Sequence, residues 1–320
     1  MMPQIWKTSL ALDYSFHTSF PFSVTLEGIF NKNVNAATVS DWSMKPVDEF
    51  ETFRGADSRP LFPASFRTDT KAFVLENTSR GYGYSANVTV RMQPVPQLSL
   101  MAAYTRTGCM EITDMPGSDA ENAFTYVPSH RSANCLTLHN SANLIPDRVV
   151  ASLTYNTRCG DHFSLIYESW RGGVNYSYMV ANDMNGDGYQ FDALYIPTDS
   201  EVMDKEFRFV SEADRDNFMS YVHKDRYLSR HQGEYAGAHS VYNPWVHRID
   251  FAYKHDFRFH IGRSENVLRL CADIRNVANI FSDRYGVVRV MNPSLDSGRI
   301  LNFEGRDPDG YATFSTNPAV

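Results

Sequence analysis

The chain has little of what a helical membrane protein, a nucleic-acid-binding protein or a common type of enzyme requires. Its 320 residues contain no apolar run long enough for a transmembrane helix. The net charge is −7 and no Lys/Arg-rich run occurs, which argues against a nucleic-acid partner. Four cysteines show neither CxxC spacing nor a zinc pattern. The sequence also lacks a Ser/His/Asp order, a glycine-rich phosphate loop and an HExxH motif, so we expect no enzyme.

The first residues lack the features of a secretory leader. Met1 to Lys7 lead directly into a strand pattern, with no basic stretch and no apolar stretch before it. A mature or truncated chain fits this start, whereas a complete secreted precursor does not.

The clearest pattern that is present is an alternation of apolar and polar residues in 246–258 and again in 266–278. A period of two predicts β-strands, because successive side chains point to opposite sides. Strands of soluble proteins usually have about 5–6 residues. Two strands of about a dozen residues joined by a short turn are typical of a membrane β-barrel, whose half-polar strands escape a hydropathy average.

Three similar pairs of alternating segments precede this one, and long connections separate the pairs. The pairs span about residues 5–31, 80–107, 148–176 and 246–278, and the long connections span about 34–79, 108–146, 177–245 and 279–320. Short turns that alternate with long loops are typical of outer-membrane barrels, with the turns in the periplasm and the loops outside. The sequence therefore predicts an all-β protein, an antiparallel transmembrane barrel segment of about eight long strands.

The apolar faces of these strands carry no Asp, Glu, Lys or Arg among the residues that define the pattern, as contact with lipid would require. Aromatic residues near the strand ends are expected to form the interfacial girdles; these are Tyr82, Tyr104, Tyr155 and Phe257. On the opposite face, Asp250 and Asp256 alternate with basic residues. We interpret them as partners in cross-strand ion pairs along a wet interior, and not as a general acid and base.

One loop motif suits calcium. Asp183, Asn185 and Asp187 offer oxygen ligands at alternate positions, and Gly188 permits a turn. The twelfth position is Leu194, so the bidentate Glu of an EF-hand is missing, and Asp192 is the residue that would replace it. The alternative is an Asn/Asp/Gly turn at a loop tip without a metal. No other cofactor is expected.

The cysteines, histidines and loop aromatics each have two readings. Cys109 and Cys135 belong to one outer loop, where an oxidising surface would permit a disulfide, or they remain two thiols; Cys159 and Cys271 are not expected to pair. Histidines recur every eight residues at 223, 231, 239, 247 and 255, but glycine and proline interrupt any single strand there, so we treat the spacing as coincidence. For four loop aromatics the sequence leaves two alternatives, binding of a sugar or peptide or packing on one another; these residues are Trp42, Tyr126, Tyr242 and Trp245.

Three groups of residues carry a resemblance: 183–197, then 227–236 followed by 244–250, and 273–281, which read Asp-Ile-Arg-Asn-Val-Ala-Asn-Ile-Phe. In this order they resemble an outer loop, the segment leading into a late barrel strand and the penultimate-strand motif of the Oar-like TonB-dependent receptors of Bacteroidota. The likeness covers roughly residues 80–303. It implies a 22-stranded outer-membrane barrel with a plug, which imports a ligand with energy from the TonB system.

The sequence departs from that family in ways that define the prediction. We find no plug domain, no TonB box and no carboxypeptidase-like domain, and residues 314–320 do not form the aromatic-terminated strand that the family uses for insertion. The resemblance therefore implies an incomplete, C-terminal part of a 22-stranded barrel. Its expected partners are outer-membrane lipid, the TonB system and plug of the remaining receptor, and a surface lipoprotein. The ligand is unknown.

Two alternatives stay open. Eight strands can close a small barrel whose interior is filled by side chains, and such a barrel would act as an adhesin or anchor. The third hypothesis is a soluble β-rich glycan-binding protein.

Overall fold

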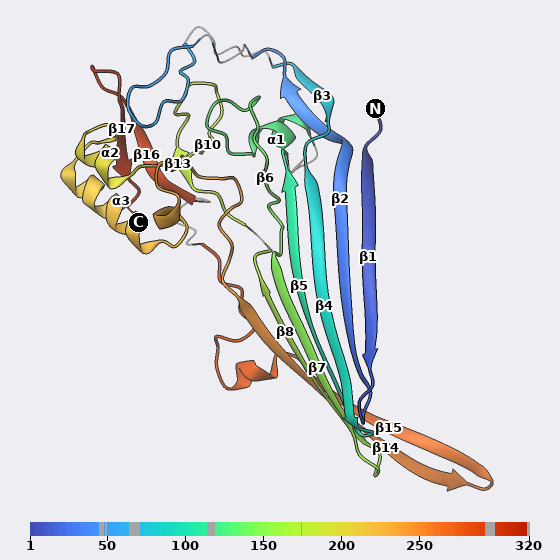
Figure 1. The fold of residues 1–320 in the computed structure, drawn as a ribbon. Coiled ribbons are helices and arrows are strands. Elements are labelled where there is room, and N and C mark those ends of the chain that lie inside the picture. The colour runs from blue at the N-terminus through green and yellow to red at the C-terminus, as the bar shows by residue number, and fades with distance from the viewer. Residues whose placement is uncertain are drawn as a thin grey trace.

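Half of the residues lie in strands and 11% in helices, and the long sheet is antiparallel, so the fold is all-β as the alternation predicts. The structure is a computed structural model that describes residues 1–44, 48, 50–63, 71–113, 119–173, 175–291 and 298–318. Two parts are distinguished here: a long sheet, and a smaller folded region at one end of its strands (Figure 1). We call this smaller region the cap.

The long sheet is an up-and-down meander of eight strands in the order β1-β2-β4-β5-β7-β8-β14-β15. Every neighbouring pair is antiparallel. Two short strands add to its path: β3 pairs with β2, and β6 pairs with β5. The strands are β1 (Gln4–Phe16), β2 (Phe22–Asp41), β3 (Phe73–Thr78), β4 (Tyr82–Val95), β5 (Leu98–Glu111), β6 (His139–Asn140), β7 (Asp147–Asn156), β8 (Asp161–Arg171), β14 (Val246–Ile261) and β15 (Ser264–Ile274).

The four predicted hairpins are confirmed, and all four short turns lie at the end of the sheet away from the cap (Figure 1). Two of the turns have two residues each: Pro96 and Gln97 between β4 and β5, and Gly262 and Arg263 between β14 and β15. Gly262 has a φ of +63°, a conformation that glycine adopts without steric cost. The alternation thus predicts the strands, and the short turns predict the two partners within each hairpin.

Two strand ends differ from the prediction. β2 continues ten residues beyond Asn31, to Asp41, because β3 supplies its hydrogen-bonding partner there. Because proline cannot donate to a sheet ladder, the sequence predicts a turn at residues 94–97. In the structure β4 instead continues through Pro94 to Val95. The register between β4 and β5 shifts between Met92 and Val95, and this irregularity accommodates the residue that cannot donate to the ladder.

The long sheet is not closed in the structure. β1 and β15 are its two outermost strands, and no pairing joins them among the described residues. Both edges therefore present backbone N–H and C=O groups that have no partner strand. A closed barrel remains a prediction.

The cap contains a five-stranded sheet in the order β10-β9-β16-β17-β12, a two-stranded sheet of β11 and β13, and most of the helices. Its strands are β9 (Met179–Ala181), β10 (Asp192–Ala193), β11 (Tyr195–Ile196), β12 (Arg208–Phe209), β13 (Glu234–Tyr235), β16 (Arg299–Arg306) and β17 (Ala312–Thr316). The helices of the chain are α1 (Ala120–Thr125), α2 (Asp199–Met203), α3 (Glu212–Lys224) and the 3-10 helices η3 (Leu228–Arg230) and η4 (Val277–Ile280).

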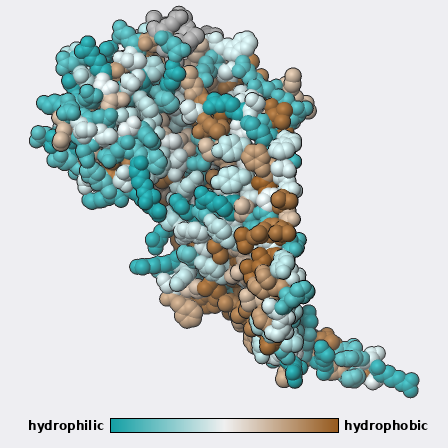
Figure 2. All heavy atoms as spheres, in the orientation of Figure 1, coloured by the Kyte–Doolittle hydropathy of each residue, from teal (hydrophilic) through white to brown (hydrophobic). Residues whose placement is uncertain are grey.

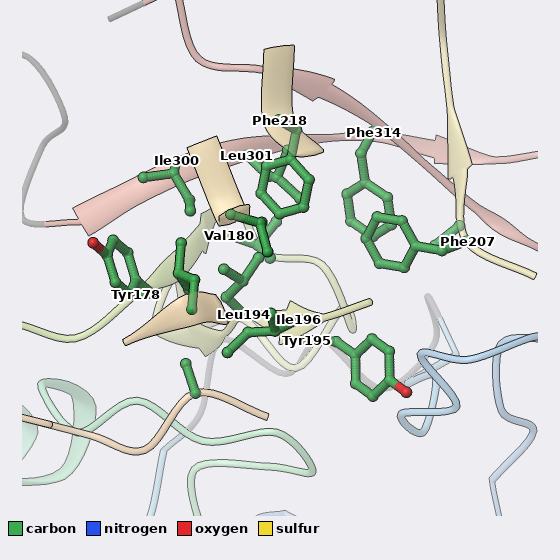
Figure 3. Close-up of a cluster of buried hydrophobic side chains, with 14 of the residues drawn as sticks. Tyr178, Val180, Leu194, Tyr195, Ile196, Phe207, Phe218, Ile300, Leu301 and Phe314 are labelled. Atoms are coloured by element: carbon green, nitrogen blue, oxygen red, sulfur yellow. The ribbon is translucent and has the colours of Figure 1, made fainter. Parts of the chain in front are cut away.

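The predicted long loops 177–245 and 279–320 are therefore more structured than we expect from the sequence. They meet in one buried core, in which Phe314 of β17 stacks on Phe207 with ring centroids 4.5 Å apart, while Leu194, Ile300 and Phe218 of α3 are fully covered (Figure 3). Apolar side chains from distant parts of the sequence leave water together here, which supplies the stability that loops without a core lack.

Candidate functional sites

One face of the long sheet is apolar across its whole width, and we call it the apolar face. The strand registers align its side chains in rows that cross the strands. One row runs through all eight strands: Phe16, Phe22, Met92, Leu100, Leu153, Leu165, Phe251 and Ile274. The next row holds Tyr14, Val24, Val90, Ala102, Ala151, Tyr167 and Ile249. A period of two in each strand, kept in register by the pairing, produces this surface.

The apolar face is exposed. Leu10 is 80% exposed, Val88 41% and Leu153 38%. Figure 2 shows hydrophobic residues gathered over the lower half of the sheet, whereas the surface of the cap is largely hydrophilic. Soluble monomers rarely expose contiguous apolar patches larger than a few hundred Å². This face is therefore the strongest candidate for an interaction surface on the molecule.

Charged groups border the apolar face at both ends. At the cap end, Asp147 accepts hydrogen bonds from the Tyr104 hydroxyl (2.7 Å) and from Nη1 of Arg106 (2.8 Å). At the turn end, Asp161 accepts one from the Tyr253 hydroxyl (2.8 Å) and lies 2.6 Å from Nδ1 of His255. His255 thus has a polar partner at the border of the apolar face.

The distance between the two borders can be estimated along β8. β8 runs from Asp161 at one border to Arg171 at the other and contains 11 residues. Ten steps of about 3.3 Å give roughly 33 Å along the strand. With the tilt of about 35–45° that barrel strands adopt, this corresponds to an apolar band roughly 25 Å tall, the usual height in outer-membrane barrels.

The opposite face of the sheet carries the expected cross-strand ion pairs. Glu168 on β8 pairs with Arg148 on β7 and with Arg248 on β14, the latter at 2.7 Å. Asp256 accepts two hydrogen bonds from Arg269 on β15, at 2.5 and 2.8 Å. We call this the polar face. Asp256 therefore forms a cross-strand ion pair, as the alternation predicts, whereas Asp250 pairs with Arg248 of its own strand at 3.4 Å.

The predicted calcium residues fall into two groups. Asp183, Asn185 and Asp187 form one compact turn, in which side-chain oxygens accept hydrogen bonds from backbone N–H groups. Asp183 accepts from Gly186 (2.7 Å) and Gly188 (2.9 Å), and Asp187 accepts from Tyr189 (2.9 Å). In the described part of the chain, no group of three or more His, Cys, Asp or Glu side chains is placed to hold a metal ion. Calcium binding stays a prediction.

Asp192, the fourth residue, faces a different partner. Its Oδ1 accepts a hydrogen bond from Arg59 Nη1 (3.1 Å) and its Oδ2 accepts one from the Met184 N–H (2.9 Å). The Arg59 side chain is fully covered, donates twice to Asp57 (2.9 and 2.8 Å) and once to the Ala193 carbonyl (2.7 Å). The sequence analysis does not predict this buried arginine with its two carboxylates, because no pattern around residue 59 indicates burial or pairing.

Burial dominates the protonation of these acids. It raises the pKa of Asp192 to about 7, although Arg59 acts in the other direction, and the charge of Asp187 adds to the rise. The pKa of Asp187 rises to about 6, again mainly through burial, with a contribution from Asp183. The pKa of Arg59 is raised, because Asp57 and Asp192 outweigh the effect of its burial.

A pocket of about 440 Å³ opens beside this buried pair. The His130 ring stacks on Tyr235 at 4.6 Å, and the Tyr235 hydroxyl donates to Asp57 (2.9 Å). Arg131 pairs with Asp48 at the rim of the pocket. The pKa of His130 is lowered, first by burial and then by the nearby charges of Arg59 and Arg131. The pocket offers one stacked aromatic pair and a mixed set of charges.

The loop aromatics do not gather at one site. The Trp42 indole donates to Glu76 (2.8 Å), Tyr126 packs edge-on against Phe191, Tyr242 lies 5.0 Å from the Arg171 guanidinium, and Trp245 stacks on His247. Each one packs on a different neighbour.

The cysteines and histidines give no shared site either. All four cysteines carry thiols, so no disulfide joins Cys109 to Cys135. The histidines with eight-residue spacing have separate partners: His223 contacts Asp199, His231 the Tyr227 carbonyl, His247 the Tyr167 hydroxyl and His255 Asp161, while the His239 ring packs against His139. These separate partners agree with our interpretation that the eight-residue spacing is a coincidence.

Comparison of the chain with protein-family models, with curated proteins and with solved structures finds no match. None of the helices in the described ranges has the length and apolar character needed to cross a membrane. The candidate function therefore depends on the residues of this chain alone.

Proposed function

We propose that the chain is part of the wall of an outer-membrane β-barrel receptor of the TonB-dependent type, with the cap on the outer side. The observation that carries the proposal is the apolar face, which is continuous across eight long strands and bordered by charged groups at both ends. The proposed family depends on the resemblance of residues 183–197, 227–236, 244–250 and 273–281.

The energetics of the apolar face support a lipid environment. Full burial of one Leu or Phe side chain is worth about 1.5–3 kcal/mol relative to exposure. The sheet leaves Leu12 60% exposed, Phe257 48% and Leu268 62% exposed. Contact with acyl chains would remove these side chains from water without any change of the backbone.

The open edges support a larger barrel. β1 and β15 each have one side with no partner strand in the described structure. In a lipid bilayer such backbone groups must be paired, because no water reaches them. We propose that additional strands of the receptor pair with both edges, that the polar face lines the aqueous interior, and that the cap presents its surface to the imported ligand.

Adjacent probes on β7 test the proposal, because Leu153 lies on the apolar face and Ser152 on the polar face. With the native cysteines replaced by serine, Leu153→Cys and Ser152→Cys receive the same fluorescent label in protein reconstituted into lipid vesicles. We expect brominated lipid to quench the label at 153 and aqueous iodide to quench the label at 152.

Three other outcomes have distinct meanings. Iodide quenching at both positions, or a compact monomer without detergent, contradicts a membrane wall and favours the soluble glycan-binding alternative. A detergent-folded monomer that migrates faster unless it is heated supports the self-contained barrel acting as adhesin or anchor, in which β1 pairs with β15. Lipid quenching at 153 from a chain that folds only with the remaining receptor supports the proposal.

A further inference from the structure

The apolar face contains a hollow that lies over two small side chains. Its volume is about 340 Å³, and its lining includes Ala102 of β5 and Ala151 of β7, which are directly paired. Larger side chains surround the two alanines: Val90 and Tyr167 in the same row, and Leu100 and Leu153 in the next. The hollow exists because each alanine has only a methyl group where its neighbours have three or more side-chain carbons or a ring.

Two arginines lie above this hollow on the same face. Arg106 is four residues from Ala102 on β5, which is about 13 Å along the strand. Asp147 is four residues from Ala151 on β7, and Arg171 of β8 is paired with Asp147. Since the apolar core of a bilayer is about 30 Å thick, the hollow and the arginines lie at the depths of one leaflet.

The arrangement leaves the positive charge outermost. The Asp147 side chain is 9% exposed, whereas those of Arg106 and Arg171 are 46% and 36% exposed. Asp147 therefore holds both arginines from beneath, at 2.8 Å from Arg106 and 3.9 Å from Arg171, and does not face outward as they do. Two cations over one covered anion leave a net positive charge for a ligand that approaches from the lipid side.

Two tyrosines fix the positions of these arginines. The Tyr84 ring lies across Gly108, where its atoms would be only 2.3–2.9 Å from a Cβ, so a larger residue at position 108 would displace the ring. The Tyr84 hydroxyl is a hydrogen-bonding partner of Arg106. Tyr242 lies under the Arg171 guanidinium at 5.0 Å. Held side chains lose less conformational entropy when they bind a ligand.

We propose that this site binds a phosphorylated lipid, with the phosphate on Arg106 and Arg171 and one acyl chain in the hollow over Ala102 and Ala151. The inference rests on the proposed function, because it requires the apolar face to meet lipid. Guanidinium groups suit phosphate through paired, charge-assisted hydrogen bonds. The hollow supplies the second half of the recognition, since it is apolar and reached from the same side.

The experiment uses the full chain in a neutral detergent and measures lipid binding by native mass spectrometry. The probes are dioleoyl phosphatidic acid, dioleoylglycerol with the same chains but no phosphate, and inorganic phosphate. The variants are R106Q/R171Q for the headgroup and A102L/A151L for the hollow. R148Q is the matched control, because Arg148 is next to Asp147 in sequence, is 54% exposed and lies on the polar face.

We expect phosphatidic acid to bind more tightly than either other probe, and R106Q/R171Q to weaken it at least about tenfold, as the loss of charge-assisted hydrogen bonds predicts. A102L/A151L should also weaken it, whereas R148Q should not. Equal binding of dioleoylglycerol, equal binding of inorganic phosphate, or an equal loss in R148Q overturns the inference. Circular dichroism and the melting temperature of each variant show whether it is folded; if the arginine variant is not, the comparison of the three probes with the unmodified chain decides.

The labelled Leu153→Cys protein separates this failure from failure of the proposed function. Lipid quenching at 153 without preference for phosphatidic acid contradicts only the proposed headgroup site. Aqueous quenching at 153 contradicts the proposed lipid-facing surface, and the lipid site with it.

Discussion

The same type of side chain is exposed in the long sheet and buried in the cap. Phe257 on β14 is 48% exposed, whereas Phe314 on β17 is 1% exposed and stacked on Phe207. In the cap, apolar residues from β9, α3, β16 and β17 cover one another. In the sheet, the apolar residues of eight strands point away from the molecule together.

The difference shows that the two parts obtain their stability from different sources. The cap has a core of its own and a buried Arg59 with two carboxylates, as a folded region in water does. In the sheet, hydrogen bonds join all neighbouring strands but leave the outer edges of β1 and β15 unpaired, and the described residues form no such core on the apolar face. Under the proposed function, the acyl chains of a bilayer would cover these exposed side chains. The predictions below test this contrast.

The largest expected effect comes from one phenylalanine in each part. Phe314→Ala leaves a cavity against Phe207 and should lower the free energy of unfolding of the cap by about 3–5 kcal/mol. Phe257→Ala removes a ring that is half exposed and should cost less than half of that. Denaturant unfolding in detergent, followed by near-ultraviolet circular dichroism, measures both. Equal losses would mean that Phe257 is packed as tightly as Phe314.

Removal of the buried cation should have a similar effect. Arg59→Met leaves Asp57 and Asp192 covered without their partner, which costs about 3–5 kcal/mol in comparable buried pairs. Arg131→Met is the control, because its pair with Asp48 lies at the surface, where such pairs contribute about 0–1 kcal/mol. The same unfolding measurement distinguishes them, and a small effect of Arg59→Met would show that its carboxylates take up protons instead.

A charge on the apolar face tests the sheet directly. Leu153→Arg should cost about 2–4 kcal/mol in lipid vesicles, the value found for arginine near the bilayer midplane. Ser152→Arg on the polar face should cost much less, because that face is lined by ion pairs and water. Urea titration of the reconstituted protein gives both values. The proposed orientation of the sheet fails if the two substitutions cost the same, or if Ser152→Arg costs more.

The sequence predicts the sheet well because its signal is local. Each strand alternates on its own, so residues 246–258 identify β14 without knowledge of any other segment. The helices of the cap had a local signal too, which our sequence reading does not use. Thr198 and Glu201 form a capping box at the start of α2, and Ser211 caps α3. These residues were readable as helix starts.

The cap core could not be predicted from such signals. β9, β10, β11, β12 and β13 have two or three residues each, which is too short for a period to appear. Ile300 and Leu301 become buried only because β16 pairs with β9 and β17, which are distant in the sequence or follow a turn. The pairing of Arg59 with Asp192 spans 133 residues, and no spacing rule connects them.

Calcium should act on the cap and not on the sheet. If the turn at Asp183, Asn185 and Asp187 binds calcium, millimolar calcium raises the melting temperature of the cap, with a stabilisation of about 2.7 kcal/mol at a hundredfold excess over Kd. Asp183→Asn should remove this increase, whereas Asp309→Asn, in another exposed turn, should retain it. Differential scanning calorimetry measures the shift. No shift in the unmodified protein rules out the metal and leaves the hydrogen-bonded turn.

The smallest expected effect is a pH dependence that belongs to His130 beside Tyr235. Its pKa is lowered in the folded protein by burial, Arg59 and Arg131, relative to about 6.5 in an unfolded chain. As the pH falls below about 6.5, the unfolded chain gains a proton that the folded protein resists, so the stability that is present above this pH is lost. Asp187 and Asp192 act with the opposite sign, because their pKa values are raised to about 6 and about 7, so the folded protein takes up these protons at a higher pH than the unfolded chain does.

His130→Gln retains those two acids and removes only the imidazole. The difference in melting temperature between the variant and the unmodified protein should therefore be constant above about pH 7 and should shift in favour of the variant below about pH 6.5. A difference that stays constant down to about pH 5 would mean that His130 titrates as it does in an unfolded chain, and that the pocket is open to water in solution.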